Sequence, residues 1–201
     1  MSRNGAQVHR RLQQAALELF RERGYDQTTA AEIAARAGVT ERTFFRHFPD
    51  KREILFDGEA ILRTALTNAI AGVPADLEPL QALLVAFHAV EAMLEENRPF
   101  SEPRHQVIAA IPALRERELA KIAALTTALA SALGQRGVKV RLATLAAQAG
   151  MAAFSYAVTS WFADPARALH AHLVEAFDDL YALSSAVVSA SPTRGRKRGR
   201  R

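Results

Sequence analysis

The fold of this chain is most constrained by two very short helices predicted within about its first fifty residues. Thr29 and Glu32 form the Thr-x-x-Glu pattern of a capping box, which begins a helix that Gly38 ends. Thr40 is a favourable N-cap for a second helix over 41–47. Because only a tight turn separates the two helices, a few residues fix how they lie relative to each other.

The rest of the sequence also reads as helix. Ala and Leu dominate, and the period-two runs of β-branched residues that mark strands are absent. Val8, Leu12, Ala16 and Leu19 place one apolar stripe along a first helix. The predicted fold class is all-α, with helices over 6–23, 29–37, 41–47, 50–71, 77–96, 101–110, 112–133, 139–162 and 165–190.

The charge of the chain is unevenly distributed. Residues 1–56 carry ten Lys/Arg and seven Asp/Glu, whereas residues 57–192 carry ten and fourteen, and residues 193–201 carry six basic residues and no acid. The surplus of +5 therefore lies at the two ends, which is typical of a polyanion-binding head on an acidic body. We predict a DNA-binding domain over 1–56, a ligand-binding and dimerisation domain over 57–190, and a disordered basic tail over 191–201 that adds non-specific phosphate affinity.

The two short helices have the layout of a helix-turn-helix. In that motif the first helix crosses the phosphate backbone, and the second enters the major groove, where base edges present an unambiguous hydrogen-bonding code. Ile33, Phe44 and Phe48 point inward in the predicted helices and pack on the first helix. The outward face of 41–47 is polar and cationic, with one aromatic side chain.

The residues of this motif resemble a known family. The run from Gly24 to Lys51 reads GYDQTTAAEIAARAGVTERTFFRHFPDK. It is similar to the TetR family signature in its GY-x-x-T-T opening, its I-A-x-x-A-G-V turn, its T-F-F-x-H-F helix and its P-x-K start of a fourth helix. The resemblance covers about the first 56 residues. It implies a homodimeric transcriptional regulator, most often a repressor, that binds a palindromic double-stranded operator and a small-molecule effector.

The resemblance also implies roles for individual residues, which are chemically sensible. Phosphate-backbone contacts fall to Thr29, Thr40, Phe45, His47 and Lys51, three of them at helix starts where free N–H groups attract anions. Base readout falls to Arg42, Thr43 and Arg46, since arginine can chelate guanine. The family commonly has tyrosine where this chain has Phe45, so that contact can only be van der Waals.

Each of these residues also has a purely structural interpretation. His47 could simply cap the end of its helix. Arg42 and Arg46 could form a solvated face paired with Glu41 and Asp50. Phe45 could pack on neighbouring helices.

In the TetR family the C-terminal helices form an effector pocket, and the last two helices pair between subunits. The helices over 139–162 and 165–190 fit that pairing, because they are long and apolar on more than one face. The same side chains could equally form a core. The candidate effector contacts are apolar and polar residues of the middle helices, namely Phe87, His88, Met93, Arg104, Gln148, Met151, Phe154 and Trp161.

The segment 99–117 and the turn 161–165 are similar to those of regulators with acyl-CoA-like ligands, which suggests an apolar or acyl-type effector. Two other functions compete with this hypothesis: a helical carrier of an apolar metabolite, and an enzyme. No catalytic arrangement can be read in the sequence, and no cofactor is expected. No metal site is expected either, because the side chains of His170 and His172 project about 200° apart on a helix. The absence of cysteine excludes thiolate chemistry, and no segment is a convincing signal peptide or membrane span, so a cytoplasmic protein is expected.

Overall fold

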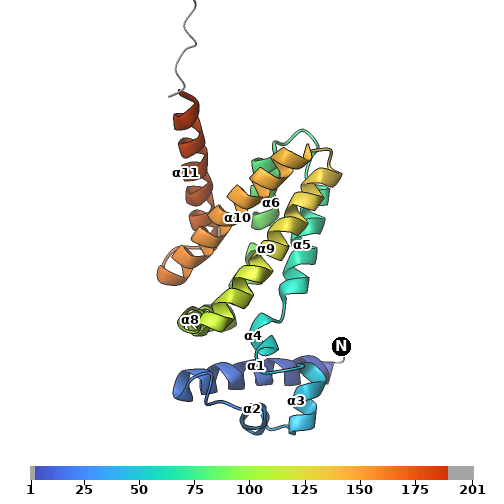
Figure 1. Cartoon of the computed structure of the whole chain (residues 1–201), viewed down its shortest axis with the longest axis vertical. Helices are drawn as coiled ribbons and strands as arrows, with labels where there is room; N and C mark the ends of the chain where they lie inside the picture. The colour runs from blue at the N-terminus through green and yellow to red at the C-terminus, as the bar shows by residue number, and fades with distance from the viewer. Residues whose placement is uncertain (1–2, 190–201) are drawn as a thin grey trace, which may run out of the picture.

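The computed structural model describes residues 3–189, and the predicted basic tail lies outside the described residues. This part of the chain is helical and has no β-strand, which confirms the all-α fold class (Figure 1). The helices are α1 Arg3–Arg23, α2 Ala30–Arg36, α3 Glu41–His47, α4 Glu53–Phe56, α5 Glu59–Gly72, α6 Pro79–His88, α7 Glu91–Glu96, α8 Arg98–Ala110, α9 Pro112–Gln135, α10 Val140–Ala163 and α11 Leu169–Ser189.

We call α1–α4 the head and α5–α11 the body. The head lies at one end of the molecule in Figure 1, with α1 crossing above α2 and α3. The predicted caps are confirmed: Thr29 and Glu32 form a complete capping box on α2, and the Thr40 hydroxyl accepts a hydrogen bond from the Thr43 N–H on α3. The apolar stripe of α1 is buried against Phe44 and Phe48.

The fourth helix differs from the prediction of one continuous helix over 50–71. It is a single turn, α4, separated from α5 by Asp57 in extended conformation and Gly58 with φ +93°. The Asp57 carboxylate pairs with the His9 ring at 2.6 Å, which draws the chain out of helical geometry and toward α1. Glycine tolerates this positive φ at no steric cost, so Gly58 permits the break that the contact with α1 favours.

One helix and two helix starts in the body also differ from the prediction. The helix expected over 77–96 is broken into α6 and α7 at Ala89 and Val90, where Val90 is buried in the core. The helix α8 begins at Arg98 instead of 101, and α11 begins at Leu169 instead of 165. In each case the helix begins or ends where packing or a turn requires it, and not where residue propensity alone would place it.

The helix α10 is central to the body and packs against α6, α9 and α11 (Figure 1). Gly150 allows close approach to α6, because an added Cβ would lie 2.8 Å from Leu83 Cδ1. By length and composition α10 is also the one helix within residues 3–189 that could span a membrane. It buries Met151, Phe154 and Trp161 in the body's core, as the core helix of a water-soluble protein does.

The cores of head and body do not follow the predicted boundary at residue 56. Val107 and Ile108 of α8 and Leu114 of α9 are buried in the cluster that contains Phe44 and Phe48. Residues far along the chain therefore complete the head's core and dock it on the body.

Candidate nucleic-acid interface

The orientation of α3 is set by its aromatic residues. Phe44 is fully buried and packs against Phe48, with ring centroids 5.8 Å apart. Because Phe44 anchors one side of the helix, the opposite side faces solvent, with Arg42, Arg46 and Phe45 exposed. Phe45 is 51% exposed and meets Phe44 edge-on, so its packing inside the head is only partial.

The two arginines of α3 are free of ion pairs within residues 3–189. Asp50, the acid expected to neutralise Arg46, instead pairs with Arg52 at 2.9 Å and accepts a hydrogen bond from the Glu53 N–H. Some other head arginines do have partners, such as Arg36, which binds Glu22 at 2.8 Å. The structure therefore presents two unpaired guanidinium groups on the exposed face of α3.

The turn between α2 and α3 is held by a residue that sequence reasoning did not select. Arg11 of α1 donates from Nε to the Ala37 carbonyl at 2.9 Å, and its Nη2 donates to the Ala37 and Gly38 carbonyls. Gly38 has φ +66°, and an added Cβ would lie 3.3 Å from Arg11 Nη2. An arginine on α1 gives no sequence signal for this role, since its partners are backbone atoms.

Two predicted phosphate-binding residues are engaged inside the head. Lys51 Nζ donates to the carbonyls of Tyr25 at 2.8 Å and Thr28 at 2.9 Å and lies 4.3 Å from the Tyr25 ring centroid. Lys51 therefore closes the loop between α1 and α2, and its contact with a DNA phosphate stays a prediction. Thr29 is exposed, but its N–H and hydroxyl both donate to the Glu32 carboxylate at 2.9 Å, and these bonds lower the pKa of Glu32.

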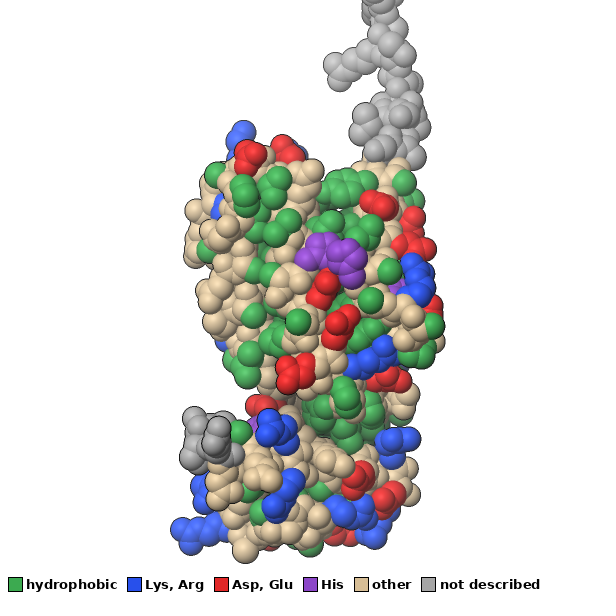
Figure 2. All heavy atoms as spheres, turned by 180° about the vertical axis from the view of Figure 1, so that it is seen from behind, with side chains coloured by type: hydrophobic (Ala, Val, Ile, Leu, Met, Phe, Trp, Pro, Cys, Tyr) green, Lys and Arg blue, Asp and Glu red, His purple; other side chains and the backbone are tan. Residues whose placement is uncertain are grey.

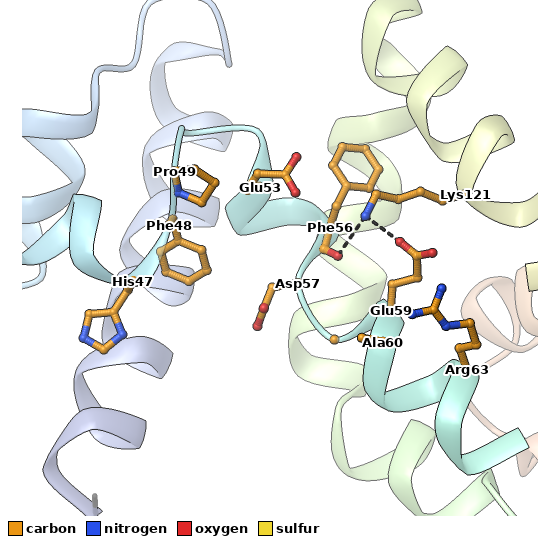
Figure 3. A pocket seen from close by; sticks show the side chains of 11 residues that line it. His47, Phe48, Pro49, Glu53, Phe56, Asp57, Glu59, Ala60, Arg63 and Lys121 are labelled. Carbon is orange, nitrogen blue, oxygen red and sulfur yellow. Dashed lines mark hydrogen bonds and ion pairs between the residues drawn. The ribbon is translucent and has the colours of Figure 1, made fainter. Parts of the chain in front are cut away.

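His47 is only half exposed at the end of α3. Its ring lies 5.7 Å from the His9 ring and also faces Phe48, and its buried Nε2 makes no hydrogen bond in the described structure. Burial lowers the pKa of His47, and the neighbouring charges of His9 and Arg46 lower it further. His47 also lines a cavity of about 290 Å³ between head and body, opposite Glu59, Arg63 and Lys121 (Figure 3).

The contact between head and body is a cationic cage around Phe56, the last residue of α4. Its ring lies 5.4 Å from the Arg104 guanidinium, 5.5 Å from that of Arg117 and 5.4 Å from Lys121 Nζ. The cage is reinforced by ion pairs with acids of the neighbouring helices: Arg117 with Glu53, Lys121 with Glu59, and Arg104 with Glu118. Through these contacts α8 and α9 hold the end of the head.

The body has an open groove of about 500 Å³ between α9 and α10. Gln148 and Met151, two of the predicted effector contacts, line it. The other lining residues are apolar or hydroxyl-bearing, namely Ile122, Ala123, Thr126, Thr127, Ala130, Thr144, Ala152 and Ser155.

The remaining predicted effector residues do not line this groove. Phe87, Phe154 and Trp161 are buried in the core, where Phe87 stacks on Phe154 at 4.4 Å, and Met93 packs at its edge. Arg104 belongs to the cage around Phe56, and His88 pairs with a glutamate. Most of these predicted effector residues therefore belong to the body's core.

The helices α10 and α11 leave apolar side chains exposed. Leu142, Leu145 and Tyr156 of α10 are 48%, 55% and 65% exposed, and Leu183 of α11 is 69% exposed. Leu145, Ala152 and Tyr156 repeat at a helical spacing that places them on one face. An apolar stripe of this kind indicates a surface that meets another protein.

An all-α chain with a tight helical turn and an exposed cationic helix is a helix-turn-helix DNA-binding regulator. Residues 12–57 match the family described as bacterial regulatory proteins, tetR family, and residues 77–184 match the MftR C-terminal domain, which alone covers more than half of the chain. The chain belongs to the TetR family. Members of this family are DNA-binding transcriptional regulators, not enzymes, which confirms the predicted family and class.

Two curated relatives match parts of the chain. The HTH-type transcriptional regulator TcmR of Streptomyces glaucescens is 44% identical over 75 residues, 37% of this chain and 33% of the relative. The uncharacterised regulator Rv2250c of Mycobacterium tuberculosis is 31% identical over 111 residues, 55% of this chain and 57% of the relative. The chain thus spans about a third to just over half of the length of these relatives.

Solved structures match over most of the chain. Thermus thermophilus FadR, a TetR-family repressor in complex with lauroyl-CoA, is 27% identical, with a TM-score of 0.55 over 94% of this chain and 100% of that one. NalD, the secondary repressor of a multidrug efflux pump in Pseudomonas aeruginosa, is 19% identical, with a TM-score of 0.61 over 89% and 96%. The second likeness supports the fold alone.

Proposed function

We propose that this protein is a homodimeric repressor that reads a palindromic operator through α3 and releases it when an acyl-type effector binds the body. The observation that carries the proposal is the exposed face of α3, where Arg42 and Arg46 have no ion pair in the described structure. Unpaired guanidinium groups on a helix that protrudes from its domain are suited to guanine edges in the major groove. Figure 2 shows several basic side chains on the surface of the head.

We assign the remaining DNA contacts from the exposure of the side chains near these two arginines. Thr43 lies beside Arg42 and Arg46 on α3 and completes the base-reading set, and Thr40 and Phe45 contact the phosphate backbone. Thr29, which is exposed at the start of α2, joins them, because a helix N-terminus favours a phosphate. His47 packs against His9 and Phe48 and supports α3 from the inside.

The dimer places two such heads side by side. The exposed side chains Leu145 and Tyr156 of α10 pair with the same side chains of a second copy, and α11 adds Leu183. A two-fold interface uses the same patch on both subunits. The two α3 helices are then related by the same two-fold symmetry as the two halves of a palindromic operator. A regulator of this kind acts in the cytoplasm.

The effector occupies the groove between α9 and α10. Its volume of about 500 Å³ lies within the usual range for small-molecule sites, and its apolar walls with scattered hydroxyl groups suit an acyl chain. The lauroyl-CoA bound to Thermus FadR supports this ligand class.

The coupling between effector and DNA runs along α9. Ile122 and Thr126 line the groove, whereas Arg117 and Lys121, less than three turns away on the same helix, hold Phe56 at the end of α4. A shift of α9 on effector binding therefore moves the head and changes the separation of the two α3 helices. Effector and operator then weaken each other's binding by the same factor.

The proposal is tested by operator binding of Arg46→Ala, measured by fluorescence anisotropy on the DNA upstream of the chain's own coding sequence. We expect a loss of roughly 1–3 kcal/mol in specific binding with an unchanged fold. Arg115→Ala is the matched control, since Arg115 is an exposed arginine on α9 in the body. Equal binding of wild type and Arg46→Ala would falsify the assignment of base readout to α3.

The effector site is tested by adding dodecanoyl-CoA to the protein–DNA complex. Thr127→Trp fills the rim of the groove, so this variant should keep its operator affinity but no longer release DNA. Thr64→Trp is the control, because Thr64 is likewise exposed and its hydroxyl likewise bonds the carbonyl four residues earlier. Release of DNA from Thr127→Trp as readily as from Thr64→Trp would place the effector elsewhere.

A further inference from the structure

Two histidines and a glutamate from distant parts of the chain meet on the surface of the body. His88 is the last residue of α6, Glu91 begins α7, and His170 is the second residue of α11. Figure 2 shows one large cluster of histidine side chains, coloured purple, on the surface of the body. None of the three lines the groove between α9 and α10 or belongs to the cage around Phe56.

The polar atoms of these residues converge on one point. Glu91 Oε1 is in contact with His88 Nδ1 and lies 3.2 Å from His170 Nδ1, and the two imidazole rings are 4.5 Å apart. One ligand atom from each residue lies within 4.8 Å of the other two. Ligands of a tetrahedral zinc ion stand about 3.3 Å apart, given bond lengths of about 2.0 Å, so small side-chain rotations would seat an ion between them.

The chemistry of the donors selects the class of ion. Two imidazoles and one carboxylate suit Zn²⁺ and similar divalent transition metals, whereas Mg²⁺ and Ca²⁺ prefer oxygen ligands. The Glu91 side chain is 17% exposed, and its ion-pair partners in the described structure are the two histidines, with no Lys or Arg to compete for its charge. The His170 side chain is 60% exposed, which leaves a path for the ion and a fourth position for water or another ligand atom.

We propose that His88, Glu91 and His170 form a binding site for a divalent transition-metal ion of the zinc type, which joins the α6–α7 corner to the start of α11. His172, two residues beyond His170, is buried, and the histidine that the fold brings to His170 is His88 of α6. The bound ion links segments that are 79 residues apart in the chain and stabilises the folded body, because the unfolded chain cannot assemble the three ligands.

Cobalt is the probe, because Co²⁺ occupies zinc sites and its visible d–d absorption reports nitrogen and oxygen ligation. The full chain without an affinity tag is titrated with Co²⁺, and Zn²⁺ is then added to displace it. We expect one equivalent of Co²⁺ per chain, and a loss of affinity of roughly a hundredfold or more in His170→Ala, since even partners of metal ligands contribute ten- to a hundredfold. His105→Ala is the matched control, because His105 is a half-buried histidine that packs against Phe162 outside the cluster.

A second measurement separates loss of the site from loss of the fold. Zn²⁺ should raise the thermal midpoint of wild type and of His105→Ala but not that of His170→Ala or Glu91→Gln, while all four unfold alike in chelator. His170 is mostly exposed, so its truncation leaves the packing of α11 intact. Absence of saturable Co²⁺ binding by wild type, or the same affinity and midpoint shift in His170→Ala as in wild type, overturns the proposal. Either result leaves the DNA-binding proposal untouched.

Discussion

The head and the body of this protein define their helices by different means. In the head, Thr29 and Thr40 hydrogen-bond the free N–H groups at the starts of α2 and α3, and Gly24 and Gly38 follow the preceding helices with φ +84° and +66°. In the body, the long helices α9 and α10 start at Pro112 and Val140 with no side-chain cap. The capping box of Glu78 and Gln81 on α6 and the φ of +89° at Gly137 after α9 show that local signals also act in the body, so the contrast concerns the starts of α9 and α10.

This difference is consistent with the tasks we assign to the two parts. A helix end fixed by its own side chains keeps its geometry when neighbouring helices move, and α3 must present Arg42 and Arg46 at constant spacing. Helices held by packing alone can shift by small amounts as a ligand enters between them. The contrast makes the head a rigid reading unit and α9–α10 the adjustable part.

The largest expected effect tests whether the two cores are energetically separate. Phe44 in the head and Phe87 in the body are both fully buried, so replacement of either by Ala should lower the free energy of unfolding by about 3–5 kcal/mol. Because Val107, Ile108 and Leu114 join the head's core, we expect one cooperative transition for both variants in urea, followed by circular dichroism.

Two resolved transitions would contradict that expectation. If Phe44→Ala lowered only an early transition and Phe87→Ala only a late one, residues 1–56 would be an independent folding unit. The predicted boundary at residue 56 would then separate two parts of the chain that unfold independently.

A somewhat smaller effect distinguishes the exposed surfaces of the body. Tyr156 on α10 and Leu119 on α9 are each 65% exposed. A glutamate at position 156 would be buried at the proposed two-fold interface without a partner, so Tyr156→Glu should weaken dimerisation by roughly 2 kcal/mol or more and shift the protein toward monomer in light scattering. Leu119→Glu should stay dimeric. The reverse pattern would move the interface to α9.

The sequence predicted the head better than the body for a physical reason. Caps and helix-ending glycines act within four residues, so Thr29, Gly38 and Thr40 could be assigned without knowledge of the fold. The breaks at Gly58 and Val90 depend on contacts with α1 and with the body's core, which no local pattern reveals.

The same limit applied to the candidate sites. Phosphate contact was predicted for Lys51, whose partners are backbone carbonyls of another loop, and Arg11 was missed because it also binds backbone atoms. The exposure of Arg42 and Arg46 on α3 agrees with the prediction. Phe44 is buried, and helical periodicity places the two arginines on the opposite face of the helix. The meeting of His88 with His170 required the three-dimensional arrangement.

A cap substitution should separate the two kinds of helix start. Thr40→Ala removes the hydrogen bond to the Thr43 N–H, 3.2 Å long, and should destabilise the protein by about 1 kcal/mol in urea denaturation. Lys139→Ala, at the uncapped start of α10, should change stability by less than about 0.5 kcal/mol. Equal losses in the two variants would show that caps do not distinguish head from body.

The smallest effect concerns the buried edge of α3 and has a definite sign. Burial, with the charges of His9 and Arg46, holds the folded-state pKa of His47 below its unfolded value, so the unfolded chain takes up the proton more readily. The stability that depends on neutral His47 is therefore intact above the unfolded pKa of about 6.5 and is lost as the pH falls from there toward the folded-state pKa. Wild type should lose more stability than His47→Gln between pH about 7.5 and about 5.5, measured by urea midpoints. A wild type that loses no more stability than His47→Gln would mean that His47 is solvated in the free protein and accessible to DNA phosphates, as its resemblance to the family pattern first implied.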